Sequence, residues 1–87
     1  MEKEYKLKTP IQFGSEKIES LKFRKPIAKD FRDMPMNPKI GDMLNVAAKI
    51  SDNPPSIIDQ LTPADMQEVL KVVGEFMEVG QPIGVQP

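Results

Sequence analysis

The sequence predicts an α+β fold, in which an N-terminal two-stranded antiparallel β-hairpin packs on a small bundle of two main helices and short helical turns. Apolar and polar residues alternate along residues 5–24, as in a half-buried hairpin. Apolar residues recur every three or four positions along residues 40–50 and again along 63–79, as in amphipathic helices. A length of 87 residues suits one domain. We place this domain at residues 1–80, with its helical part at 27–79.

The first strand is predicted over residues 5–13. Its inner face is formed by Tyr5, Leu7, Thr9, Ile11 and Phe13, opposite Lys6, Lys8 and Gln12. Pro10 lies on the outward face, and a proline nitrogen has no hydrogen to donate to a strand ladder. We therefore expect this strand to lie at a sheet edge or to carry a bulge at Pro10.

The second strand is predicted over residues 17–24, after a turn at residues 14–16 that begins with glycine. Ile18 is out of phase with the other apolar residues of this strand, and one extra residue near Glu19 and Ser20, as in a β-bulge, would bring them to one face. A two-stranded hairpin is marginally stable alone, so its apolar face needs a cover. That face comprises Leu7, Ile11, Phe13, Leu21 and Phe23.

The segment after the hairpin is rich in proline. Pro26 ends the second strand, and residues 28–33 have the length of about one helical turn. We expect that turn to bury Ile27 and Phe31. Residues 34–38 contain two prolines and an asparagine, so they form a connector that continues no helix.

The middle helix follows this connector and ends before the Pro54-Pro55 pair. Its core face, at 100° per residue, comprises Ile40, Met43, Leu44, Ala47 and Ile50, with Val46 beside it. A second short helical turn is predicted at residues 56–61, and it should offer Ile57, Ile58 and Leu61 to the core.

The last helix has the clearest start signal in the chain. Thr62 is a candidate N-cap, Pro63 suits the first helical position, and Asp65 can complete a capping-box arrangement. The helix should run to Val79 and stop at Gly80. Its core stripe comprises Met66, Val69, Leu70, Val73, Phe76 and Met77. Residues 81–87, with closely spaced proline and glycine and no periodicity, are predicted to form a disordered tail.

The composition argues against an enzyme. The chain contains no histidine and no cysteine, the residues that most often supply acid-base, nucleophilic and transition-metal chemistry at neutral pH. It has no glycine-rich phosphate loop and no metal-ligand spacing. Asp30 and Asp33 share a helical turn, which is the ordinary arrangement of solvated carboxylates. We therefore predict no catalytic residue, no cofactor and no metal site, and the absence of a long apolar run argues against a membrane partner.

Charge is unevenly distributed along the chain. Residues 1–41 hold ten Lys or Arg against six Asp or Glu, and residues 42–87 hold two against seven, which gives the net charge of -1. Such a dipolar chain permits head-to-tail self-association, although a solvated basic hairpin beside an acidic helical half explains the pattern equally well. A basic hairpin can also enter a DNA groove, but the slightly acidic whole chain argues against nucleic acid.

Two apolar surfaces are candidate partner-binding sites. The first is Met34 and Met36, because flexible methionines in a broken connector suit adaptable contacts, and six methionines are many for this length. The second is the side of the last helix that carries Val72, Phe76 and Val79, where the apolar arc widens to about 180°, more than one packing contact needs. The alternative for this second surface is that the hairpin or the middle helix covers it.

Two short segments carry a family resemblance: Leu-Lys-Phe-Arg-Lys-Pro at residues 21–26 and Leu-Thr-Pro-Ala-Asp-Met at residues 61–66. Around them lie a strand and glycine turn, Asp30-Phe31, a helix, a Pro54-Pro55 break and a final helix with Phe76-Met77. Over residues 5–79 this layout resembles the small tail assembly chaperone family of Mu-like and related contractile-tailed bacteriophages and prophages. The connector at residues 34–38 departs from the resemblance, since it is richer in proline.

The resemblance implies a non-enzymatic protein with two partners. Such a chaperone coats the long, helical tape measure protein in the host bacterial cytoplasm and helps bring tail tube subunits to it. It is not expected in the mature virion. Two rival functions stay open at this point: a structural tail component, which would be found in purified particles, and a small DNA-binding phage regulator, whose DNA binding would weaken steeply with salt.

Overall fold

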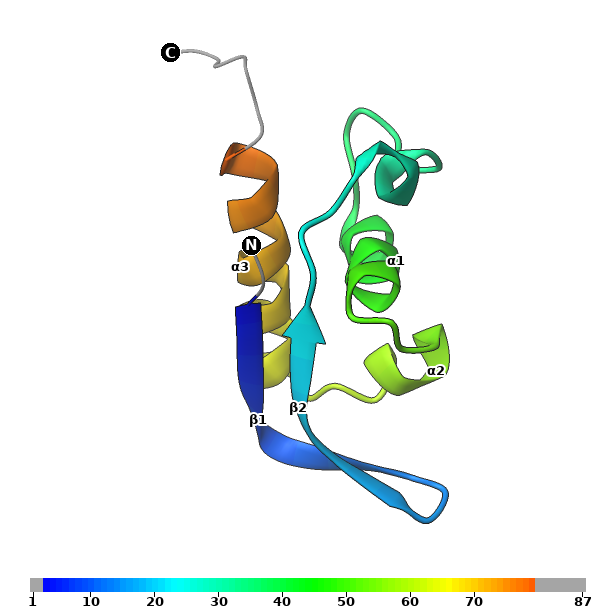
Figure 1. Ribbon diagram of the computed structural model, residues 1–87, viewed down its shortest axis with the longest axis vertical. Helices are drawn as coiled ribbons and strands as arrows, with labels where there is room; N and C mark the ends of the chain where they lie inside the picture. Colours follow the sequence, from blue (N-terminus) through cyan, green and yellow to red (C-terminus); the bar gives the residue numbers. More distant parts are fainter. Residues whose placement is uncertain (1–2, 80–87) are drawn as a thin grey trace.

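The computed structural model describes residues 3–79, and these form an α+β fold as predicted (Figure 1). The elements in chain order are β1 (Lys3–Phe13), β2 (Glu16–Phe23), the 3-10 turn η1 (Ala28–Phe31), α1 (Ile40–Ile50), α2 (Pro55–Ile58) and α3 (Pro63–Val79). The hairpin lies against α3, and α1 packs on α3, α2 and η1. The predicted stop at Gly80 and the predicted tail at 81–87 lie outside the described residues.

The hairpin is antiparallel, and its register shifts once along its length. Lys6 pairs with Ser20, and the next pair along is Ile11 with Ile18, so residues 7–10 of β1 face the single residue Glu19 of β2. The predicted bulge in β2 is therefore wrong, and the predicted irregularity at Pro10 is confirmed. The extra residues lie in β1 because Pro10 has no amide hydrogen and its neighbours bond elsewhere.

Beyond this bulge the hairpin bends away from the helices and projects from the body (Figure 1). Thr9 is exposed, and Phe13 keeps 38% of its surface exposed, so the predicted inner face is wrong at these two residues. The bulge moves Thr9 out of alternation, and Phe13 lies past the end of the helices. Gly14, with φ of 64°, begins the two-residue turn, as type II′ hairpin turns require.

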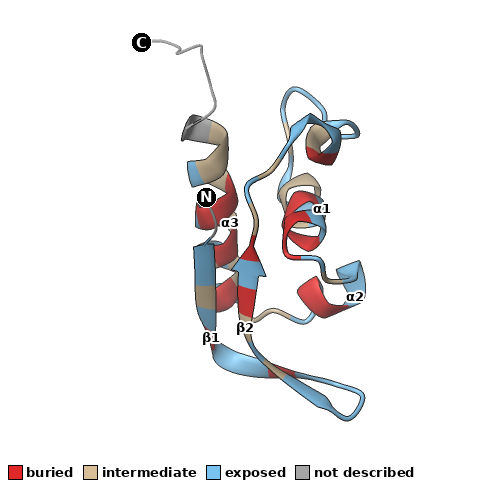
Figure 2. Cartoon of the chain, viewed as in Figure 1, coloured by how far each residue is buried: buried red, intermediate tan, exposed pale blue. Residues whose placement is uncertain are grey.

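The core lies between α1, α3 and the part of the hairpin that carries Leu7, Ile11, Leu21 and Phe23 (Figure 2). Its buried apolar residues are Leu7, Ile11, Leu21, Phe23, Val46, Ala47, Ala48, Ile50, Ile57, Ile58, Val69, Val72 and Val73. The short turn α2 delivers its two isoleucines as predicted. Ser51, Asp52 and Asn53 then close α1, because the amides of Asp52 and Asn53 donate to the carbonyls of Lys49 and Ala48, as in a Schellman motif.

The buried faces of the two main helices differ from the prediction at a few residues in α1 and by a rotation in α3. In α1, Met43, Leu44, Ala47 and Ile50 pack in the core as predicted. Ile40 is 55% exposed instead, and Ala48 is buried. In α3, the buried arc is centred near Val69 and Val72, so Leu70 is only half-buried. Ile27 is also 55% exposed rather than buried, whereas Phe31 packs on the core as predicted.

Candidate partner-binding site

A buried carboxylate, Asp65, fixes the hairpin to the start of α3. Its side chain is fully buried and accepts hydrogen bonds from Tyr5 Oη (2.6 Å), the Lys8 amide (3.0 Å) and the Thr9 amide (3.0 Å). These two amides belong to the bulge and have no partner in β2. Thr62 Oγ1 also donates to the carboxylate and accepts from the Asp65 amide, so the predicted N-cap is confirmed. We call this group the hairpin–α3 junction.

The junction perturbs the two titratable groups at its centre. Burial raises the pKa of Asp65, but the hydrogen bonds donated by Tyr5, the two bulge amides and Thr62 lower it by more, so the pKa lies below its usual range. The hydrogen bond to the Asp65 carboxylate raises the pKa of Tyr5 to about 12. Asp65 is therefore ionised and Tyr5 neutral at pH 7, a stable donor and acceptor pair without a proton to exchange.

A second buried carboxylate, Asp30, anchors η1. Arg24 donates two hydrogen bonds of 2.8 Å to its two oxygens, and the Ile27 amide donates a third of 2.8 Å. The hydrogen bond from Arg24 is the main cause that lowers the pKa of Asp30 to about 2. Asp30 is only 2% exposed, so the prediction that its carboxylate is solvated is wrong. Because the Arg24 amide also donates to the Ile50 carbonyl (2.9 Å), the pair holds η1 against the end of α1.

Large apolar side chains are exposed before η1, between η1 and α1, and at the start of α1. We call residues 27–40 the connector segment. Ile27, Met36 and Ile40 are 55%, 96% and 55% exposed, whereas Met34 packs on the core and its amide donates to the Phe31 carbonyl. The described residues have only one further large exposed apolar side chain, Phe13 at the hairpin tip. Three of the four large exposed apolar side chains of the described fold thus belong to the connector segment.

The structure places some of the predicted partner-binding residues on the surface and others in the core. Met36 is on the surface, and Met34 anchors the connector segment beneath it. Val72 is 6% exposed and belongs to the core, so it offers no surface, and Phe76 is half-buried against that core. The side chain of Val79 lies outside the described residues. The wide apolar arc of α3 is therefore explained up to Phe76 by the packing of the hairpin and α1 around this helix.

Sequence reasoning missed Ile27 and Ile40 as surface residues. Ile40 was assigned to a core face by periodicity, and Ile27 to the buried side of a helical turn. Ile27 is the N-cap of η1, however, and Ile40 is the first residue of α1. A first helical turn next to a proline-rich connector has fewer neighbours to cover it than an internal turn. The location of Ile27 and Ile40 at the start of an element could therefore have indicated that they are exposed.

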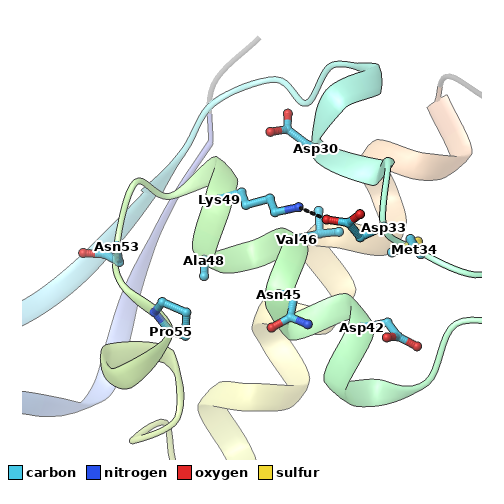
Figure 3. A pocket seen from close by; sticks show the side chains of 10 residues that line it. All are labelled: Asp30, Asp33, Met34, Asp42, Asn45, Val46, Ala48, Lys49, Asn53 and Pro55. Atoms are coloured by element: carbon cyan, nitrogen blue, oxygen red, sulfur yellow. Dashed lines mark ion pairs between the residues drawn. The ribbon is translucent and has the colours of Figure 1, made fainter.

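A groove of about 240 Å³ lies between α1 and residues 30–34 of the connector segment (Figure 3). Its lining residues are Asp30, Asp33, Met34, Asp42, Asn45, Val46, Ala48, Lys49, Asn53 and Pro55. Asp33 and Asp42 stand toward one end, and Asn53 and Pro55 toward the other (Figure 3). Lys49 Nζ reaches within 3.9 Å of Asp33 Oδ2 across the groove.

The carboxylates of the groove and the junction lie apart or are already hydrogen-bonded. Within residues 3–79, no three His, Cys, Asp or Glu side chains lie close enough together to hold a metal ion. Asp30 and Asp65 already spend their oxygens on internal hydrogen bonds. No helix in the described part of the chain is long and apolar enough to cross a membrane.

Comparison with known proteins gives the family of the chain. A search of curated proteins and a search of solved structures each give no match to the chain. The model of one protein family, described as phage tail assembly chaperone proteins, E, or 41 or 14, matches residues 4–78. This match spans every element of the fold from β1 to α3. The chain therefore belongs to the phage tail assembly chaperone family.

Proposed function

We infer that the protein binds the tape measure protein through its connector segment and helps recruit tail tube subunits while the tail is assembled. The observation that supports this proposal most is the exposed apolar surface at Ile27, Met36 and Ile40 in a member of a tail assembly chaperone family. Binding would take place in the host bacterial cytoplasm, and the protein would be released before the virion is complete.

The connector segment has properties that suit reversible binding of an apolar helix. Pro35 and Pro38 restrict its backbone in the free state, which lowers the conformational entropy lost on binding. The Arg24–Asp30 pair and Met34 hold its first half against the body. Met36 adds a flexible thioether that can adapt to different apolar partners.

The proposed role is non-enzymatic and depends on many weak contacts. One exposed methionine and two isoleucines bury too little apolar surface for tight binding by a single copy. A tape measure protein with repeated apolar stripes would take up several copies along its length, and the copies together would cover it. The chaperone then needs only enough affinity to keep those stripes from one another.

Co-expression tests this proposal. The tape measure protein encoded nearby is produced with and without the chaperone, and its soluble fraction and co-elution on size exclusion are measured. We expect the tape measure protein to be soluble and to co-elute only with the chaperone. The substitutions Met36→Asp and Ile40→Asp should abolish both effects, since each places a charge on the proposed surface.

The matched control is Phe13→Asp, which places the same charge on the other exposed apolar residue, at the hairpin tip. It should keep the tape measure protein soluble. Elution of the wild-type chaperone alone, beside an aggregated tape measure protein, would contradict the proposal. Recovery of the chaperone in purified virions would instead favour a structural tail component.

A further inference from the structure

The two edges of the hairpin differ in whether another strand can pair with them. β1 carries Pro10 and the bulge, and two of its amides already donate to Asp65. These features close the edge of β1 to a new strand. β2 contains no proline, and the register shift adds no residue to it. Its residues 16–19 are exposed except for the half-buried Ile18, and within the described part of the chain their backbone forms no hydrogen bond outside the hairpin.

The alternation of the backbone decides which groups of β2 point outward. The residues on either side of the two-residue turn form a hydrogen-bonded pair, and so do Ile11 and Ile18 two positions further along. The N–H and C=O groups of Lys17 and Glu19 therefore point away from β1. They lie on the part of the hairpin that projects from the body (Figure 1). Free donors and acceptors at alternate positions are what an added antiparallel strand requires.

The sequence of β2 is complementary to itself about Ile18. When a second β2 runs antiparallel with Ile18 opposite Ile18, Lys17 of each copy lies opposite Glu19 of the other. Their outward groups can then form hydrogen-bonded pairs, and their opposite charges meet on one side of the sheet. Within residues 3–79, neither side chain has an ion pair of its own. A register shifted by two residues places Lys17 opposite Lys17 or Glu19 opposite Glu19, so the charges favour the register centred on Ile18.

The same register extends an apolar row across the sheet. In the free hairpin, the buried Ile11 lies opposite Ile18. In the pair, the row continues through Ile18 and Ile11 of the second copy, because residues directly opposite each other share a face. The resulting sheet has four strands, whereas a two-stranded hairpin is marginal alone. The turn of the second copy lies beside residues 21–22, where its glycine and serine need little room.

We propose that two copies of the chain pair through the edge of β2 at residues 16–20, with Ile18 on the two-fold axis and Lys17 opposite Glu19. Five residues from each copy make a small interface, so the dimer is weak and forms at high protein concentration. Each dimer carries two connector segments. Two weak sites on one particle bind a repetitive partner more tightly than one site does.

Sedimentation velocity of the full chain over a range of concentrations tests the pairing. We expect the wild-type chain to pass from monomer to dimer as its concentration rises. Lys17→Glu and Glu19→Lys should each raise the dimer dissociation constant by about tenfold or more, since each places like charges opposite each other twice. The double variant Lys17→Glu/Glu19→Lys restores both pairs and should return the constant to within about threefold of the wild-type value. Lys71→Glu makes the same charge change on the exposed face of α3 and should change it by less than about twofold.

A cysteine on the two-fold axis locates the interface, because the chain contains no cysteine of its own. Ile18→Cys places two thiols across a non-hydrogen-bonded pair, whose Cα atoms lie about 4.5 Å apart, within the range of a disulfide. This variant should form a disulfide-linked dimer under mild oxidation. Ser15→Cys, at an exposed turn residue, lies about 20 Å from its counterpart in this register and should stay monomeric.

A wild-type chain that stays monomeric at every concentration would overturn the pairing. A double variant that dimerises as weakly as the single variants would overturn it too, as would equal cross-linking of Ile18→Cys and Ser15→Cys. The co-expression experiment tests the proposed function separately, because these substitutions leave the connector segment unchanged.

Discussion

The hairpin–α3 junction buries a charged side chain, whereas the connector segment exposes apolar side chains. At the junction, a charged group is fully buried and four donors converge on it, from Tyr5, Lys8, Thr9 and Thr62. In the connector segment, apolar side chains stand in solvent although the core lies close by. Burying a charge costs stability unless it is well paired, and exposing apolar residues forgoes the stability that their burial would give.

From this difference we infer that the junction stabilises the fold and that the connector segment binds a partner. The junction satisfies amides that the bulge in β1 would leave unpaired, so it secures a two-stranded hairpin that would be marginal alone. The connector segment contributes little to the stability of the fold. The exceptions are Met34 and the Arg24–Asp30 pair at its start. Substitutions at the junction should therefore change folding, and those on the exposed connector residues should change binding.

The largest stability effect is expected from Asp65→Ala. Removing this carboxylate leaves Tyr5 Oη and two bulge amides without their acceptor and removes a helix-start interaction, at a cost of about 3–5 kcal/mol in unfolding free energy. For a domain of this size that is a large share of the total stability. Urea denaturation followed by circular dichroism measures it. Asp33→Ala, at an exposed carboxylate, serves as control and should cost less than about 0.5 kcal/mol. A loss below about 1 kcal/mol for Asp65→Ala would refute the role of the junction.

Tyr5→Phe should have an intermediate effect, because it removes one donor to a charged acceptor and leaves the others, at about 1.5–3 kcal/mol. The raised pKa of Tyr5 adds a dependence on alkaline pH. Unfolded Tyr5 ionises near pH 10 and folded Tyr5 only near 12, so this contribution is complete below pH 10 and is lost as the pH rises to about 12. Denaturation between pH 9 and pH 12 should therefore show a steeper loss for the wild-type chain than for the variant. Parallel curves would exclude the hydrogen bond as its cause.

Acid should weaken the start of the connector segment through Asp30. Its pKa is lowered to about 2 in the folded state, so the stability it contributes is complete above about pH 4 and is lost as the pH falls toward 2. In Asp30→Asn, we expect the fall in unfolding free energy between pH 4 and pH 2 to be smaller by about 1–2 kcal/mol. Equal falls in both proteins would show that Arg24 and Asp30 do not pair in solution.

The smallest stability effect is expected from Met36→Ser. The side chain is 96% exposed, so its unfolding free energy should stay within about 0.5 kcal/mol of the wild-type value. Partner binding should nevertheless weaken. A thermal melt measures the first quantity, and co-elution with the tape measure protein the second. A large loss of stability would place Met36 in the core and refute the contrast between the two regions.

The sequence allowed most of the fold to be predicted, because apolar periodicity and capping signals are local. The turn at Gly14, the N-cap Thr62 and the helical turn that buries Ile57 and Ile58 follow from neighbouring residues alone. The irregularity at Pro10 was also predicted, from the missing amide hydrogen of proline. The role of Asp65 was not, because this residue is more than 50 positions away from the bulge amides whose hydrogen bonds it accepts. The rotation of the buried face of α3 depends likewise on which elements pack together, which no local pattern contains.

The candidate site was predicted less completely than the fold. Met36 was identified because a methionine between prolines has no element to pack on, and it is exposed. Ile27 and Ile40 were assigned to the core because periodicity records which side chains share a face, without showing whether that face is covered. Val72 was predicted to lie on a partner-binding surface but is buried. The hairpin and α1 together cover the wide apolar arc of α3 on which it lies.

Hydrogen exchange in the free chaperone and in its complex with the tape measure protein tests the central claim most directly. We expect amides of residues 27–40 to exchange more slowly in the complex. The Lys8 and Thr9 amides, which already donate to Asp65, should keep the rate of the free protein. Slower exchange confined to the hairpin or α3, with residues 27–40 unchanged, would contradict the assignment of binding to the connector segment.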